Sequence, residues 1–187
     1  MPYIDIIAHD QADGRLKEIY DHLVKTRGKL AEVHMIQSLN PDSIMHHMDM
    51  YMGIMFGKSP LKRAQREMLA VVVSMANNCE YCQTHHGAAL NHYWKDSKKL
   101  EQFKADFRSV SLSEQEYLLC EYAQLLTLSP NKIDTSGIIT RIKAANIDDR
   151  TLLDAALVVS YFNFVNRMVL GLGVQLESDK GEGFKYK

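Results

Sequence analysis

Cysteine is scarce in this sequence, with three residues, Cys79, Cys82 and Cys120, in a chain of 187. Three thiols are too few for a small secreted fold that is held together by several disulfides. Two of them are separated by only two residues, and in a reducing compartment this spacing indicates redox or metal chemistry rather than a structural crosslink. The sequence therefore directs attention to the region around Cys79 and Cys82.

An excess of one charge is also missing, because 22 lysine and arginine residues oppose 23 aspartate and glutamate residues. Proteins that bind nucleic acids or anionic membranes usually carry a basic surface, so we expect neither partner. No apolar run approaches the ~20 residues that span a bilayer. The first residues lack the basic and apolar segments of a signal peptide, and we therefore expect a cytoplasmic protein.

Strand patterns are absent as well, since no alternating β-branched runs stand between tight turns. The chain is instead 46% hydrophobic, with apolar residues recurring at helical spacing. We expect one all-α domain over residues 1–187, with a core region at 60–93 and a flexible tail at 177–187. The expected helices, eight or nine in number, cover residues 12–26, 31–39, 42–56, 60–76, 79–93, 97–107, 113–127, 135–145 and 149–170.

Several residues mark where these helices begin and end. Pro41 and Pro60 each follow a helix-capping residue type and fit the first position of a helix. Gly57 is placed to end the helix that starts near Pro41. Ser111 and Glu114 have the spacing of a capping box ahead of an apolar run, which predicts a helix start there.

One short segment carries most of the chemical information. Asn77 and Asn78 are poor helix formers and good caps, so one helix can end there and another can begin at Cys79. A helix N-terminus stabilises a thiolate. Cys82 lies on the same face, close enough to Cys79 for a disulfide, and His86 lies one turn further, where its imidazole can reach the sulfur.

Glu67 precedes Cys79 by twelve residues, which is about 18 Å on one continuous helix at ~1.5 Å per residue. If the chain reverses just before Cys79, Glu67 and His86 lie at similar heights on antiparallel helices. The carboxylate can then accept a hydrogen bond from His86 and orient this imidazole as a base toward Cys82. We expect the apolar neighbours of Glu67 to bury it partly and to raise its pKa.

The pattern Glu-x11-Cys-x2-Cys-x3-His, placed in an apolar helix pair, resembles the active-site signature of the alkylhydroperoxidase-D (AhpD) family within the carboxymuconolactone decarboxylase-like superfamily. It covers residues 67–86 of this chain. The chain length and the segment YFNFVNRMVLGLGV are similar to the longer subgroup of peroxidase-related proteins. Tyr81 stands where some members carry a second histidine between the cysteines, so that accessory role has no matching residue.

The resemblance implies an all-helical, homo-oligomeric thiol peroxidase or disulfide reductase, with its redox centre at the N-terminus of a central helix. Glu67, Cys79, Cys82 and His86 match the family's relay glutamate, two redox cysteines and relay histidine. A hydroperoxide would oxidise one thiol to a sulfenic acid, and the other thiol would close the Cys79–Cys82 disulfide. His86 favours Cys82 as the attacked sulfur, whereas the helix-terminal position and expected exposure favour Cys79.

The same resemblance implies a hydroperoxide substrate and an external dithiol reductant, either a lipoyl-protein or a thioredoxin-like protein. It implies no cofactor and no metal. A decarboxylase or isomerase of small ring acids, as in the namesake enzymes of the superfamily, is an alternative, although that chemistry needs no cysteine pair. A non-catalytic helical oligomerisation protein with vestigial thiols is a second alternative.

The residues around the motif also have structural interpretations. Cys79 and Cys82 can be buried structural thiols, or zinc ligands together with His86 and either His85 or His92.

Outside the motif we expect structural roles. We expect Cys120 to be buried in its apolar run, His85 to face solvent or an interface, and His47 to lie at the surface. Asn163 and Asn166 are expected to bond across helices if they are buried.

Overall fold

The structure is a computed structural model, and it describes residues 1–178. Within these residues it contains nine α-helices, two 3-10 turns and no strand, which confirms the all-α prediction. The elements are α1 (Gly14–Arg27), α2 (Glu32–Met35), α3 (Pro41–Phe56), α4 (Arg63–Ala76), α5 (Glu80–Trp94), α6 (Ser97–Ala105), η1 (Phe107–Ser109), α7 (Glu114–Leu128), η2 (Pro130–Lys132), α8 (Ile138–Ala144) and α9 (Asp149–Leu172).

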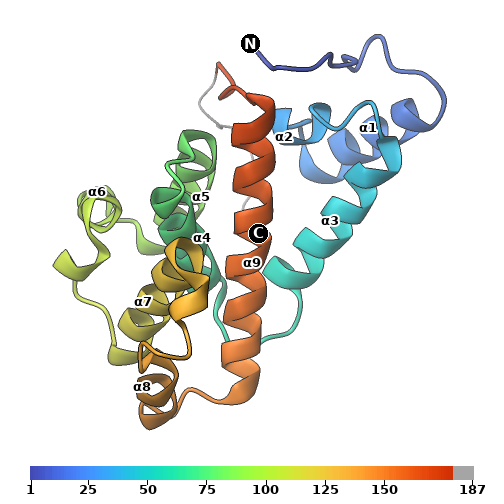
Figure 1. Cartoon of the computed structure of the whole chain (residues 1–187). Coiled ribbons are helices and arrows are strands. Elements are labelled where there is room, and N and C mark those ends of the chain that lie inside the picture. The colour runs from blue at the N-terminus through green and yellow to red at the C-terminus, as the bar shows by residue number, and fades with distance from the viewer. Residues whose placement is uncertain (179–187) are drawn as a thin grey trace.

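The long helix α9 runs through the middle of the molecule and is drawn in orange to red in Figure 1. On one side, α4 and α5 form the most extensive helix pair, and α7 packs against both α4 and α9. On the other side, α3 packs against α9 and also contacts α1. The shorter helices α6 and α8 lie at the outside of the bundle (Figure 1).

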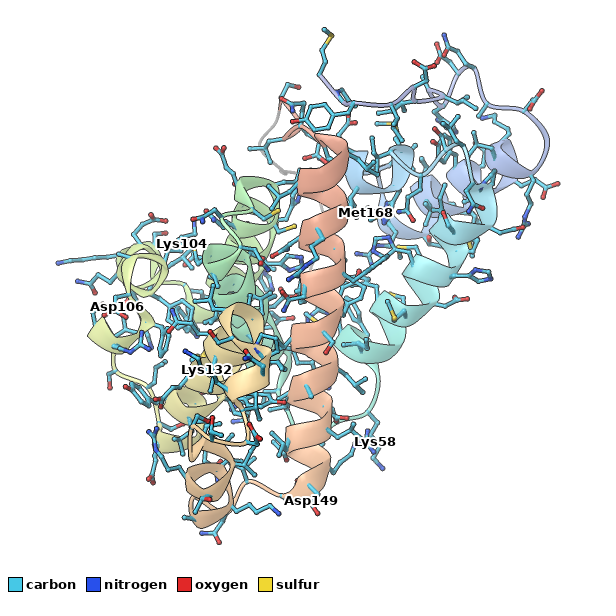
Figure 2. All side chains as sticks on the ribbon, in the orientation of Figure 1. Lys58, Lys104, Asp106, Lys132, Asp149 and Met168 are labelled. Atoms are coloured by element: carbon cyan, nitrogen blue, oxygen red, sulfur yellow. The ribbon has the colours of Figure 1, made fainter. Side chains whose placement is uncertain are left out.

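The central helices are apolar on most of their faces, as their sequences predict. In α4 every residue from Arg66 to Ser74 is buried, and α9 buries Val158, Val159 and Phe162 among others. Each fully buried side chain of this kind contributes about 1.5–3 kcal/mol. Figure 2 shows side chains filling the space between these helices. Side chains on these helices are therefore held in place by rigidly packed elements.

A partly buried amide cluster connects the end of α4 to α9. The side chain of Asn77 donates hydrogen bonds of 3.1 Å to the amide oxygens of Asn163 and Asn166. Asn163 also donates to Thr127 of α7 (3.0 Å), and Asn166 donates to Ser74 of α4 (3.4 Å). This confirms the expected bonding of Asn163 and Asn166 across helices. Satisfied networks of this kind specify one arrangement of the helices that they join.

Two helix starts differ from the predictions by three residues. α4 begins at Arg63 rather than at Pro60, and the Ser59 hydroxyl accepts a hydrogen bond from the Leu61 amide instead of capping the helix. α8 begins at Ile138 rather than at residue 135, after Gly137. Gly137 has a φ of +72°, a left-handed conformation that glycine adopts without strain and that interrupts a helix.

α9 has 24 residues and is, contrary to our expectation from the sequence, long and apolar enough to cross a membrane by length and composition alone. It is the one helix of this kind among the described residues, and it packs against α3, α4 and α7. A core helix meets the same criterion. Of the tail predicted at 177–187, residues 179–187 lie outside the described part, and Glu177 is hydrogen-bonded to the fold.

The capping box at the start of α7 lies two residues beyond the predicted pair. The Ser113 hydroxyl accepts from the Glu116 amide (3.3 Å), and the Glu116 carboxylate accepts from the Ser113 amide (3.0 Å). The hydroxyl of Ser111, which the sequence pattern favoured, takes no part in it. Replacing Ser113 and, separately, Ser111 by alanine therefore distinguishes the contribution of the cap to stability from the effect of any serine-to-alanine change in this loop.

We expect Ser113→Ala to lower the free energy of unfolding by about 1 kcal/mol, because it removes the acceptor for a helix-terminal N–H. Ser111→Ala should change it by no more than a few tenths of that amount. Urea denaturation of both variants measures the difference. Equal destabilisation by the two substitutions would contradict the capping assignment.

Candidate active site

The chain reverses between α4 and α5, as the sequence predicts. α4 ends at Ala76, and Asn78 adopts a left-handed conformation with a φ of +54°, which asparagine tolerates better than most residues. The Cys79 amide donates to the Ser74 carbonyl (2.9 Å), which closes the turn, and α5 starts at the next residue. The reversal brings the C-terminal part of the motif back alongside α4.

Glu67 and His86 meet across this helix pair. The His86 Nδ1 lies 2.7 Å from Oε2 of Glu67, so the predicted hydrogen bond is present. The other carboxylate oxygen of Glu67 accepts from Arg63, whose Nε lies 2.8 Å away and whose Nη2 also donates to it. Both oxygens of Glu67 are therefore engaged, one by an imidazole and one by a guanidinium.

The pKa of Glu67 is lowered rather than raised, which corrects the prediction from the sequence. Its side chain is fully buried, and burial alone would raise the pKa. The charge and hydrogen bonds of His86 and Arg63 together outweigh this effect. Glu67 is therefore an anion that can orient and stabilise a protonated His86.

The two motif cysteines are free thiols and both are buried, Cys79 completely. The exposure expected for Cys79 is therefore wrong. The pKa of Cys79 is lowered, because the thiol of Cys82 donates to its sulfur and the Cys82 amide bonds to it as well, while burial opposes this effect. The pKa of Cys82 is raised well above its ordinary value, because its proton is held by Cys79 and because it is buried.

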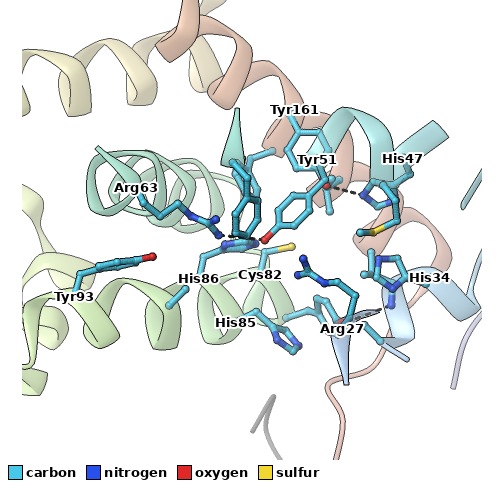
Figure 3. A pocket seen from close by; sticks show the side chains of 18 residues that line it. Arg27, His34, His47, Tyr51, Arg63, Cys82, His85, His86, Tyr93 and Tyr161 are labelled. Atoms are coloured by element: carbon cyan, nitrogen blue, oxygen red, sulfur yellow. Dashed lines mark hydrogen bonds between the residues drawn. The ribbon is translucent and has the colours of Figure 1, made fainter. Parts of the chain in front are cut away.

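A cavity of about 100 Å³ opens on one side of α5, and Cys82 is the cysteine that lines it (Figure 3). Tyr51, Tyr161 and Phe162 supply aromatic walls, and His86 lies beside Cys82. Cys79 does not line the cavity. The remaining lining residues come from α1, the α1–α2 connection, α2, α3, α4, α5 and α9.

Residues 44–93, which contain α4 and most of α3 and α5, match the carboxymuconolactone decarboxylase family. An alkylhydroperoxidase AhpD core, a peroxidase-related protein from Ralstonia eutropha JMP134, has a similar structure, with a TM-score of 0.84 and 18% identity over 96% of this chain and 94% of its own. The chain therefore has the AhpD-like fold.

Two further structures with the AhpD-like fold differ in what they are described to do. A peroxidase-related protein from Silicibacter sp. TM1040 has a TM-score of 0.81 and 24% identity, covering 97% of this chain and 92% of its own. The debrominase Bmp8, as a cysteine-to-alanine variant in complex with 2,3,4-tribromopyrrole, has a TM-score of 0.78 and 17% identity, covering 95% and 93%. At these identities the likeness establishes the fold, while the activity has to be argued from this chain's own site.

Two histidines on the cavity wall of this AhpD-like chain are buried rather than exposed. His47, expected at the surface, lies 2.7 Å through Nε2 from the Tyr161 hydroxyl and 2.9 Å through Nδ1 from the Gln37 amide. Burial lowers the pKa of His47 to about 4. Burial, aided by the nearby His47 and Arg27, lowers the pKa of His34 to about 3. Both rings are therefore neutral near pH 7.

A second carboxylate–histidine pair lies on the other side of Cys82. Glu177, which follows α9, accepts from the Tyr81 hydroxyl (2.8 Å) and lies 2.8 Å from Nε2 of His85. It also accepts from the Glu32 amide (3.2 Å), which ties the segment after α9 to α2. His85 is thus largely buried and bound to a carboxylate, contrary to the expectation that it faces solvent.

No three residues of the types that bind metals converge within residues 1–178, so the zinc alternative gains no support there. Of the residues predicted for the site, the structure brings together Glu67, His86 and Cys82 around one wall, with Cys79 behind them. Cys120 is buried elsewhere in the core, as predicted.

Sequence reasoning missed three residues that line the cavity, Arg27, His34 and Tyr51, and also Glu177, which bonds to the lining residues Tyr81 and His85. They come from α1, α2, α3 and the segment after α9, and no local spacing connects them to the cysteine motif. Only the packing of these elements onto α5 and α9 reveals their common location.

We expect Glu177→Gln to lower the free energy of unfolding at pH 7 by about 1–3 kcal/mol, the usual cost of losing a charged hydrogen-bond acceptor. The His85 and Tyr81 hydrogen bonds lower the pKa of Glu177 to about 2, although burial opposes them. Because this pKa lies below the ordinary value of 4.5, the stabilisation is complete above about pH 4.5 and is lost as the pH falls toward 2.

Urea denaturation at several pH values between 3 and 7 tests this expectation. The difference between the wild type and Glu177→Gln should shrink below about pH 4.5. Glu101→Gln, in which an exposed carboxylate is replaced, serves as the control and should show a small difference at every pH. A wild-type minus Glu177→Gln difference that does not change with pH would contradict the assignment.

Proposed function

We propose that this protein is a thiol oxidoreductase that reduces organic hydroperoxides with the dithiol of Cys79 and Cys82. The observation that carries the proposal is the position of Cys82 on the wall of a cavity, beside a His86 ring that is held 2.7 Å from the buried carboxylate of Glu67. A thiol, a base and a group that orients the base are the three components of an activated sulfur nucleophile.

The raised pKa of Cys82 explains why a base is needed there. His86, through Nε2 and either directly or across one water, accepts the Cys82 proton, and the anionic Glu67 stabilises the resulting imidazolium. The Cys82 thiolate attacks the outer oxygen of the hydroperoxide, the O–O bond breaks and a sulfenic acid forms on Cys82. The departing alkoxide takes the proton from His86 and leaves as an alcohol.

Cys79 is suited to the second step, because its pKa is lowered by the hydrogen bonds from Cys82. Its thiolate attacks the sulfenic sulfur, a disulfide forms, and the hydroxyl leaves as water after protonation. In sum, two thiols and one hydroperoxide give one disulfide, one alcohol and one water. We assign the attacking role to Cys82 because it lines the cavity, and the resolving role to Cys79.

An external dithiol must then reduce the disulfide, and its two thiols become a disulfide in return. We propose a lipoyl-protein or a thioredoxin-like protein for this step. Reduction requires one sulfur of the incoming dithiol to reach Cys79 or Cys82. Since both cysteines are buried and only Cys82 lines the cavity, we expect a slender dithiol to enter through the cavity and attack at Cys82.

Three alanine variants test the dithiol. After one equivalent of cumene hydroperoxide, the wild type should lose two free thiols, and mass spectrometry of its peptides should find a Cys79–Cys82 disulfide. Cys82→Ala should not react, and Cys79→Ala should stop at the sulfenic acid. Cys120→Ala removes a buried thiol outside the site and should behave as the wild type does. Full reaction of Cys82→Ala would contradict the proposal.

The proton relay is tested by His86→Gln, which keeps a polar side chain but no base. We expect the rate of thiol oxidation at pH 7 to fall about 10²–10⁴-fold, the usual contribution of a positioned base. At a pH high enough to ionise Cys82 directly, the loss should become smaller. The control is His92→Gln on the same helix, since His92 does not line the cavity. A loss that stays constant with pH would argue against a relay.

Reductive debromination is a second candidate, favoured by the dithiol on an aromatic-walled cavity and by the fold shared with a debrominase. Two thiols and one bromoarene would give a disulfide, the debrominated arene and hydrogen bromide. Incubation with 2,3,4-tribromopyrrole and measurement of bromide separates this activity from peroxide reduction. Turnover of a ring acid that survives alkylation of both cysteines would instead favour the decarboxylase-like alternative.

A further inference from the structure

Arg27 places a guanidinium in the cavity without a carboxylate partner. It belongs to the last turn of α1, and Figure 3 shows it pointing into the cavity toward the side of Cys82. No carboxylate of residues 1–178 forms an ion pair with Arg27. Arg27 contacts the sulfur of Met52 through Nη1 at 3.5 Å, and it also interacts with the Tyr51 side chain, whose ring centre lies 5.3 Å from its carbon Cζ.

The charges around the cavity leave this cation uncompensated. The lining includes two arginines and no aspartate or glutamate. The charge of Arg63 is balanced by Glu67 behind the wall, so Arg27 provides the excess positive charge of the cavity. A cation that is partly removed from water and unpaired has a strong preference for an anionic partner.

Two other polar atoms at the cavity also have unused hydrogen-bonding capacity. Nδ1 of His34 and Nη1 of Arg63 are buried and have no hydrogen-bond partner within the described residues. His34 is 8% exposed and lines the cavity, as Arg63 does. Buried polar atoms in proteins nearly always have partners. The Arg27 guanidinium and two buried polar atoms without partners around one cavity therefore indicate a bound polar group.

We propose that the cavity binds a small organic carboxylate, with the carboxylate group on Arg27 and the apolar part against Tyr51, Tyr161 and Phe162. This rests on the proposed function, and it defines the substrate as a hydroperoxide that also carries a carboxylate. A guanidinium binds a carboxylate through two parallel N–H groups, and an aromatic ring against its face leaves that edge available. The walls are apolar enough to hold a ring or a short hydrocarbon chain.

Direct stabilisation of the Cys82 thiolate is the competing role for Arg27. The site already supplies a base through His86 and Glu67, and the Cys82 proton is held by Cys79. The two roles differ in what they affect: a substrate-binding Arg27 discriminates between acids and neutral analogues, whereas a thiolate-stabilising Arg27 affects every substrate equally.

The binding experiment uses two probes that do not react, benzoate and its neutral analogue benzamide, with calorimetry on the reduced protein. We expect benzoate to bind at least tenfold more tightly than benzamide, and Arg27→Gln to weaken benzoate binding about 10–100-fold, as expected for a charged hydrogen bond. Lys25→Gln removes the same charge from an exposed position on the same helix and should bind as the wild type does. Equal binding of the two probes to the wild type would overturn the proposal.

The kinetic experiment compares cumene hydroperoxide with its 4-carboxy derivative. We expect kcat/KM of the wild type to favour the acid, and Arg27→Gln to reduce this ratio at least tenfold through KM. Arg27→Lys, which keeps the charge but not the two parallel N–H groups, should recover part of the ratio and guards against a folding defect. An equal loss for both hydroperoxides would assign Arg27 to the thiolate and overturn the proposal.

The two experiments separate this inference from the proposed function. If benzoate binds through Arg27 but neither hydroperoxide reacts, the carboxylate site stands and the peroxidase function fails. If both hydroperoxides react equally well and benzoate binds no better than benzamide, the function stands and the carboxylate site fails.

Discussion

The carboxylate of Glu67 is completely buried, and the organisation of the site depends on how its two oxygens are used. One oxygen accepts from Arg63 on the same helix, and the other lies 2.7 Å from the His86 ring on the antiparallel helix. Burying a charge is costly unless it is paired and hydrogen-bonded, and here each oxygen has a partner. The same carboxylate therefore helps fix the register of α4 against α5 and sets the orientation of the imidazole next to Cys82.

The two sulfurs share one turn of helix but have unequal surroundings. Cys79 receives the thiol and amide hydrogen bonds of Cys82, whereas Cys82 lines the cavity and has His86 as its neighbour. One sulfur lies where a substrate can reach it, and the other ionises more easily. This arrangement suits two successive steps, attack on the substrate and closure of the disulfide. A pair of structural thiols would have no need of this asymmetry, and the third cysteine, in the core, has none of it.

The sequence predicted those features that depend on local chemistry. The all-α class follows from missing strand patterns, and the chain reversal follows from Asn77 and Asn78, which end α4. The hydrogen bond between Glu67 and His86 follows from that reversal. The solvent exposure of individual side chains was predicted less well, because the burial of Cys79 depends on elements distant in the sequence. The direction of the pKa shift of Glu67 was missed, since it depends on whether burial or the interactions with His86 and Arg63 dominate.

The cavity wall opposite Cys82 has a property that follows from its buried histidines. The pKa values of His34 and His47 lie at about 3 and about 4, so neither ring gains a proton between roughly pH 5 and 9. No aspartate or glutamate of the described residues lines the cavity. The electrostatic potential at this wall is therefore insensitive to acidification over that interval, and a response of the cavity to a changing pH has to originate on the side of the sulfurs and their proton acceptors.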